Sequence, residues 1–183
     1  MSVTTRSPAP RLAALALALG ALAPRARAQL PVPGVNPFSF GVEAGPAIPV
    51  GAFGDVSKTG FTADALVEAR VPVLPVGVRF EAGYSQFGAK AVGGDTRRAF
   101  TGSADVVLRT SPVALTLVRP YLLGGLSVVN VNQGGGTKVG FNVGGGLSVP
   151  LAVVTAFGDV RYTHAGTAGP GFSTVPIRIG VRF

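Results

Sequence analysis

The chain has 183 residues, which suits one domain or at most two. It contains 27 glycines and 15 prolines, only 13% of its residues are charged, and no apolar run reaches the roughly 18 residues that a membrane-spanning helix needs. The formal net charge is +8, but the basic residues are too scattered to predict nucleic-acid binding, and the absence of cysteine excludes disulfides, thiol catalysis and lipid attachment at a cysteine.

The first 28 residues have the three parts of a secretory signal peptide. Arg6 and Arg11 precede an apolar run at 12–23, and Ala26-Arg27-Ala28 then places small residues two apart. We therefore expect residues 1–28 to be recognised by the secretion translocon and removed after export. Their removal takes away four arginines and leaves 12 basic and 8 acidic residues, a net charge of +4.

The rest of the chain predicts strands. Residues 29–37 are a Pro-rich lead-in without expected regular structure, and residues 38–183 are expected to form one barrel domain. The strands are predicted at 38–47, 61–71, 76–87, 99–110, 118–130, 138–149, 153–163 and 174–183. The link that contains Gly51 and Gly54 is predicted as a loop, and Pro150 as the end of the sixth strand. Strands this long, with longer Gly-rich links alternating with shorter ones, are typical of an all-β, eight-stranded antiparallel up-and-down transmembrane barrel.

Charged residues within each predicted strand share one face. Asp64, Glu68 and Arg70 have the same parity in the second strand, and Arg178 and Arg182 have the same parity in the last. The residues expected on the charged face are Glu43, Asp64, Glu68, Arg70, Arg79, Glu81, Asp105, Arg109, Arg119, Asp159, Arg161, Arg178 and Arg182. Because both signs are nearly balanced and arginine predominates over lysine, we predict a structural ion network that fills a narrow lumen.

The opposite face is apolar, and its aromatic residues lie near the strand ends. Those that adjoin the longer links are Phe61, Tyr84, Phe100, Phe141 and Tyr162, and those at the other end are Phe40 and Phe183. Alternation alone also fits a soluble barrel with an apolar interior. Two aromatic girdles are instead expected at the two interfaces of a membrane, so we predict that the apolar face contacts lipid.

The last strand alternates strictly, with Ile177, Ile179 and Val181 on its apolar face, and ends on Phe183. In this it resembles the final strand of bacterial outer-membrane β-barrel proteins, most closely the eight-stranded group of the OmpA transmembrane domain and OmpX. The resemblance implies that these four residues are a signal for the barrel assembly machinery and that the protein lies in outer-membrane lipid. The chain departs from some relatives in its short loops and in having no peptidoglycan-binding domain.

The sequence gives little indication of catalysis. The single histidine, His164, is followed by Ala165 and Gly166, so the close His-x-Ser pairing of lipid-modifying enzymes with this type of barrel is missing, and Ser173 is the next serine. We predict a monomeric, non-enzymatic outer-membrane protein with a structural or surface-interaction role and no cofactor or metal. The alternatives are a narrow ion or small-solute channel, a soluble exported barrel that binds an apolar ligand, and a lipid-modifying hydrolase.

Overall fold

The computed structural model describes residues 37–71, 74–110, 117–132, 136–166 and 171–183. The predicted signal peptide, 1–28, and the lead-in, except Pro37, lie outside these residues. Residues Pro37–Phe183 form one unit.

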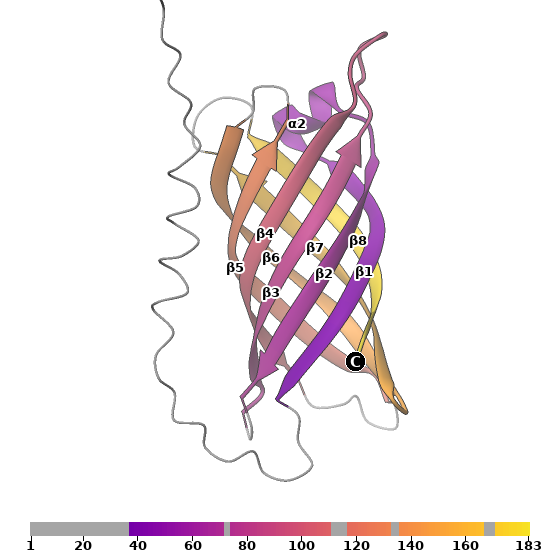
Figure 1. Cartoon of the computed structure of the whole chain (residues 1–183), viewed down its shortest axis with the longest axis vertical. Helices are drawn as coiled ribbons and strands as arrows, with labels where there is room; N and C mark the ends of the chain where they lie inside the picture. The colour runs from indigo at the N-terminus through magenta and orange to yellow at the C-terminus, as the bar shows by residue number, and fades with distance from the viewer. Residues whose placement is uncertain (1–36, 72–73, 111–116, 133–135, 167–170) are drawn as a thin grey trace, which may run out of the picture. The chain divides into compact units, whose positions relative to one another are not determined.

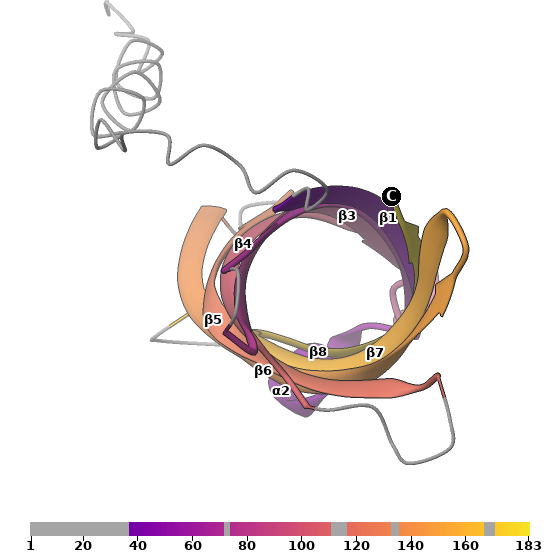
Figure 2. The same ribbon diagram turned by 90° about the horizontal axis from the view of Figure 1, so that it is seen from below.

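Eight antiparallel strands close into a barrel in which neighbours in sequence are neighbours in space, and the last strand pairs with the first. Figure 1 shows the tilted strands from the side, and Figure 2 shows the closed ring from below. The strands are β1 (Phe38–Pro49), β2 (Gly60–Arg70), β3 (Val76–Phe87), β4 (Arg97–Arg109), β5 (Arg119–Val131), β6 (Gly136–Leu151), β7 (Val154–Ala165) and β8 (Phe172–Arg182). The predicted fold class is confirmed, with strand bounds that differ by two residues or fewer.

Two local predictions were wrong. The link after β1 contains a short helix, α2 (Gly51–Val56), where a loop was predicted. Its Phe53 is buried, so packing of that side chain outweighs the low helix propensity of the two glycines. The second error is at Pro150, because β6 continues to Leu151. The pairing of β6 with β5 ends at Ser148, so Pro150 is paired with β7 alone and its missing N–H is tolerated as on an edge strand.

The charged faces of the strands point into the barrel and the apolar faces point outward. Glu68 and Arg79 are 0% exposed, whereas Leu126 and Ile179 are 68% and 76% exposed. A soluble barrel would need the reverse arrangement, because its apolar side chains would have to lie inside. The soluble alternative is therefore contradicted by the direction of the two faces.

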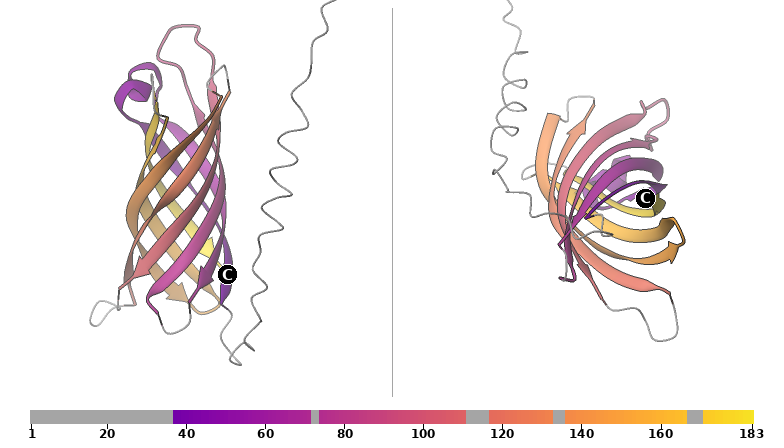
Figure 3. Two further views of the ribbon diagram at one scale, coloured as in Figure 1. Left: turned by 90° about the vertical axis from the view of Figure 1, so that its left-hand side faces the viewer. Right: turned by 60° about the horizontal axis from the view of Figure 1, so that its bottom comes forward.

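Aromatic side chains gather at both ends of the outer face. At the end that bears α2, here called the loop end, Tyr84 lies 6.2 Å from Phe61 and 5.3 Å from Phe100 between ring centroids. At the opposite, turn end, Phe40 and Phe183 exchange two backbone hydrogen bonds. Figure 3 shows α2 and the C-terminus at opposite ends of the barrel. In the parts of the chain that are described, no helix is long and apolar enough to cross a membrane.

Candidate functional site

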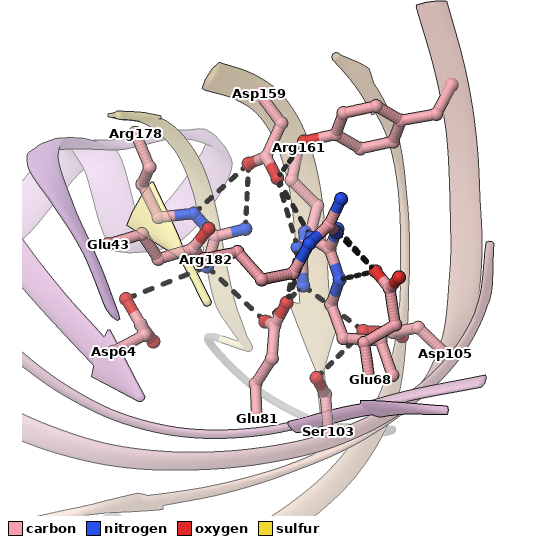
Figure 4. Close-up of polar contacts among 12 residues, drawn as sticks. Glu43, Asp64, Glu68, Glu81, Ser103, Asp105, Asp159, Arg161, Arg178 and Arg182 are labelled. Carbon is pink, nitrogen blue, oxygen red and sulfur yellow. Dashed lines mark hydrogen bonds and ion pairs between the residues drawn. The ribbon is translucent and has the colours of Figure 1, made fainter. Parts of the chain in front are cut away.

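The middle of the lumen is built around Arg161 of β7, which is 2% exposed. Its guanidinium donates two hydrogen bonds to Glu81, at 2.5 and 2.8 Å, in the bidentate geometry that favours arginine over lysine. It also donates to Asp105 at 3.2 Å and to Asp159 at 3.4 Å. Figure 4 shows these side chains, which come from β3, β4 and β7, pointing toward one another.

A second buried arginine, Arg178 of β8, extends the network toward β1 and β2. It donates to Asp159 at 2.9 and 3.2 Å and forms an ion pair with Glu43 at 2.7 Å. Longer contacts join it to Glu81 at 3.5 Å and Asp64 at 3.6 Å. Carboxylates from four strands thus share one cation, which ties together strands that are far apart in sequence.

Toward the turn end, the network centres on Glu68 of β2, a fully buried carboxylate. Arg79 donates to it at 3.0 and 3.1 Å and Arg182 at 2.8 Å. Arg109 also contacts it, and Arg70 lies at 3.5 Å. Arg79 connects this group with the middle of the lumen through contacts of 3.5 Å to the carboxylates there.

One of the predicted network residues does not join it. Arg119, the first residue of β5, is exposed at the turn end and makes no ion pair with any other described residue. Arg70 is at the margin, since its side chain is 45% exposed. The structure brings the remaining eleven predicted side chains together in the lumen as described above. Because Arg119 is exposed at the rim, water solvates its charge, and the side chain needs no carboxylate partner.

The loop end of the lumen contains an apolar cluster that sequence reasoning missed. Phe53 of α2 lies 5.1 Å from Phe87 and 4.9 Å from Phe172 between ring centroids. The other members of this loop-end cluster are Ala47, Ala99, Val129 and Ala165. Phe87 and Phe172 share the parity of the charged residues in their strands, and this signal could have revealed them. The inward position of Phe53 has no comparable signal, because it depends on the packing of α2.

A smaller apolar group lies in the turn half of the lumen. It consists of Leu66, Val107, Tyr121, Leu123 and Phe157. The guanidinium of Arg79 lies 5.3 Å from the ring centre of Tyr121 and 5.4 Å from that of Phe157. Gly146 and Gly180 make room for these rings, since a Cβ at either position would come within 2.6 Å of one. The lumen therefore contains both apolar and charged side chains.

The outer surface of the loop end has a polar hollow of about 300 Å³ between α2 and the link from β3 to β4. It is lined by Asp55, Lys90, Asp95 and Arg97, together with Val56, Ala89, Ala91 and Gly94. Two backbone hydrogen bonds, from Lys58 to Gly88 at 2.7 Å and from Lys90 to Val56 at 3.1 Å, join the two links. This hollow can offer both signs of charge to a partner at the surface.

The structure brings His164 and Ser173 together, although nine residues separate them in sequence. They are paired across β7 and β8, and His164 Nδ1 lies 2.8 Å from Ser173 Oγ. His164 is stacked on Tyr162, with ring centroids 6.4 Å apart. Sequence reasoning looked for a neighbouring serine and could not foresee the strand register. Across the described ranges, no group of three or more His, Asp or Glu residues could hold a metal ion.

No family model matches the sequence, and no curated protein matches it. Solved structures do match. Neisserial surface protein A is similar with a TM-score of 0.62 and 21% identity, over 80% of this chain and 96% of that chain. The fold is that of the eight-stranded outer-membrane barrels.

Two further structures agree on this fold. A major outer membrane protein from Thermus thermophilus has a TM-score of 0.58 and 17% identity, over 81% of this chain and 99% of that chain. The outer membrane enzyme PagL has a TM-score of 0.52 and 13% identity, over 79% and 98%. The resemblance first indicated by the last strand is thus confirmed for the fold. Proteins with this fold include an enzyme, PagL, and proteins whose names give only their location.

Proposed function

We propose that this protein is a monomeric outer-membrane barrel with a structural or surface-interaction role, without catalysis, and that its lumen does not conduct. In this proposal residues 1–28 are a signal peptide handled by the secretion translocon, 29–37 are a lead-in, and 38–183 are the barrel. Ile177, Ile179, Val181 and Phe183 present the signal for the barrel assembly machinery, and the outward apolar face contacts outer-membrane lipid.

The observation that supports this role is the packing of side chains inside the lumen. The loop-end cluster lies across the barrel around Phe53, and the ion network occupies its middle. An eight-stranded barrel is only wide enough for its own side chains, so little space is left for a solute. The surface-interaction role is supported by the polar hollow beside α2, which lies at the end of the barrel where the links are longer.

Conductance across a planar bilayer tests the proposal against the alternative of a narrow channel. We expect no stepwise current from the wild-type protein. Exchange of charge at Arg79 or Arg161 serves as the comparison, since in a channel these substitutions would change ion selectivity. Discrete wild-type current steps whose selectivity reverses in the Arg161→Glu variant would establish the channel and refute the proposal.

The contact between His164 and Ser173 favours a second candidate, a hydrolase that acts on lipid. A serine within hydrogen-bond distance of a histidine is the first requirement of a serine nucleophile. Against this role, Ser173 is 8% exposed, and no carboxylate of the described residues is paired with His164. Labelling with a fluorophosphonate tests it, with Ser173→Ala as the control. Labelling of the wild type alone would favour the hydrolase, and equal absence of labelling would favour the non-catalytic role.

A further inference from the structure

The turn end of the lumen has more arginine than its carboxylates can neutralise. Arg70 and Arg109 are the last residues of β2 and β4, Arg119 is the first of β5, and Arg182 is the last of β8. All four have the parity of the lumen face. Among the described side chains, Glu68 supplies the one carboxylate at this level. Counted over side chains alone, four positive charges face one negative charge.

The middle of the lumen has the opposite imbalance. Five carboxylates lie there, those of Glu43, Asp64, Glu81, Asp105 and Asp159, against the three arginines Arg79, Arg161 and Arg178. These carboxylates are already engaged with the central arginines. Among the described side chains, Glu68 is therefore the carboxylate that compensates the repulsion among the arginines at the turn end.

Glu68 has no oxygen left for another donor. One oxygen accepts from Arg79 and Arg182, and the other faces Arg70 and Arg109. Arg182 is 4% exposed and donates to Glu68 through Nη1, but its Nε has no acceptor among the described residues. Figure 4 shows this contact between Arg182 and Glu68.

A second buried donor lies on the neighbouring strand, β1. Ser39 of β1 is 7% exposed and directly opposite Glu68 in the ladder, and its Oγ also has no partner in the described structure. Ser39 is two residues from Gly41, which pairs with Arg182. Buried polar groups are nearly always hydrogen-bonded, so two unpaired donors on the neighbouring strands β1 and β8, at the end of the lumen that is rich in arginine, indicate a place for an anion.

We propose that the turn-end mouth of the barrel binds a phosphate group. Arg70, Arg109 and Arg182 surround it, Arg119 attracts it at the entrance, and the hydroxyl of Ser39 donates a further hydrogen bond. The planar guanidinium matches phosphate oxygens in a two-point geometry that a halide cannot offer, and the negative charge of a phosphate opposes the excess positive charge. Inorganic phosphate and the headgroup of a phospholipid at this end both present this chemistry.

Titration with inorganic phosphate, followed by two-dimensional ¹⁵N–¹H NMR in a maltoside detergent that contains no phosphate, tests the site. We expect saturable shifts of backbone amides at the turn end. Arg70→Gln and Arg119→Gln remove exposed side chains, so the barrel should still fold, and each should weaken binding about fivefold. Arg98→Gln is the matched control, because Arg98 is exposed at the loop end and its loss changes the net charge equally.

A second arm distinguishes the sources of phosphate. The same amides are followed in the phosphate-free maltoside while a short-chain phosphatidylglycerol is added, because a phosphatidylcholine reference would already contain a headgroup phosphate. Shifts with inorganic phosphate support a free anion, and shifts with phosphatidylglycerol alone support a lipid headgroup. Absence of turn-end shifts in both arms, or shifts that the Arg70→Gln/Arg119→Gln variant leaves unchanged, would overturn the site. The proposed role of the barrel would stand in that case, since it rests on the loop-end cluster and the lumen.

Discussion

Replacement of Arg161 by methionine tests whether the lumen network stabilises the barrel. Arg161 is 2% exposed and contacts three carboxylates. Glu81 and Asp159 keep other arginine partners in the variant, whereas Asp105 loses the one ion-pair partner that it has in the described structure. Removal of one partner of a buried ion pair costs about 3–5 kcal/mol, and we expect a loss of that size in the free energy of unfolding.

A second substitution identifies the cause of that loss. Asp105→Asn removes the carboxylate that Arg161→Met leaves unpaired, while its remaining oxygen can still accept the hydrogen bond from Ser103, which is 2.9 Å long in the wild type. The double variant should therefore recover part of the lost stability, with a coupling energy of roughly 0.5–3 kcal/mol.

The assay is urea unfolding of the barrel in lipid vesicles. The chain contains no tryptophan, so β-sheet circular dichroism replaces indole fluorescence as the observable. Arg98→Met at the exposed loop end is the control and should change stability by less than about 0.5 kcal/mol. If Arg161→Met unfolds within about 1 kcal/mol of the wild type, or Asp105→Asn restores nothing, then the lumen charges are solvated and the reasoning fails.

Four other substitutions test separate parts of the structure. Phe53→Ala should lower the free energy of unfolding by about 3–5 kcal/mol, measured by the same urea titration, because it empties the loop-end cluster; a smaller effect than that of Val56→Ala at the surface would argue against the cluster. Leu126→Arg, on the outward face in the middle of β5, should cost about 2–4 kcal/mol in vesicles, and a neutral result would contradict contact with lipid. Phe183→Ala keeps the backbone pair with Phe40, so it should reduce membrane insertion in cells while heat-modifiable gel migration of the folded barrel is retained; normal insertion would refute the assembly signal. His164→Ala should leave the lipid composition of the membrane unchanged, as mass spectrometry of extracted lipid would show.

Much of the fold could be predicted because strand parity is a strong constraint. A one-residue shift would reverse every side chain of a strand, so Arg178 and Arg182 on one face and Ile177 and Ile179 on the other are sufficient to orient β8. The same argument placed Glu68 and Arg79 inside. It could not determine which charges pair, because residues such as Arg161 and Glu81 lie 80 positions apart on strands that are not neighbours and meet across the lumen.

What the sequence did not indicate depends on tertiary packing. The helix at Gly51–Val56 has poor local propensity, and it forms where Phe53 can reach Phe87 and Phe172. The contact of His164 with Ser173 likewise follows from the register of β7 and β8. Arg119 shares the parity of the lumen residues, but parity gives no depth along the barrel axis, so its position at the rim was not foreseen.

The packing of Phe53 also constrains the order in which the strands of the barrel can assemble. Its aromatic partners come from β3 and from β8, and the backbone N–H of Val50, just before α2, donates to Ser173 of β8 at 3.0 Å. The link that contains α2 therefore cannot complete its packing until the last strand, β8, is in place. Protection of Phe53 from solvent is consequently a marker of ring closure: a barrel that has inserted seven strands but not the eighth would leave this ring exposed to a water-soluble label.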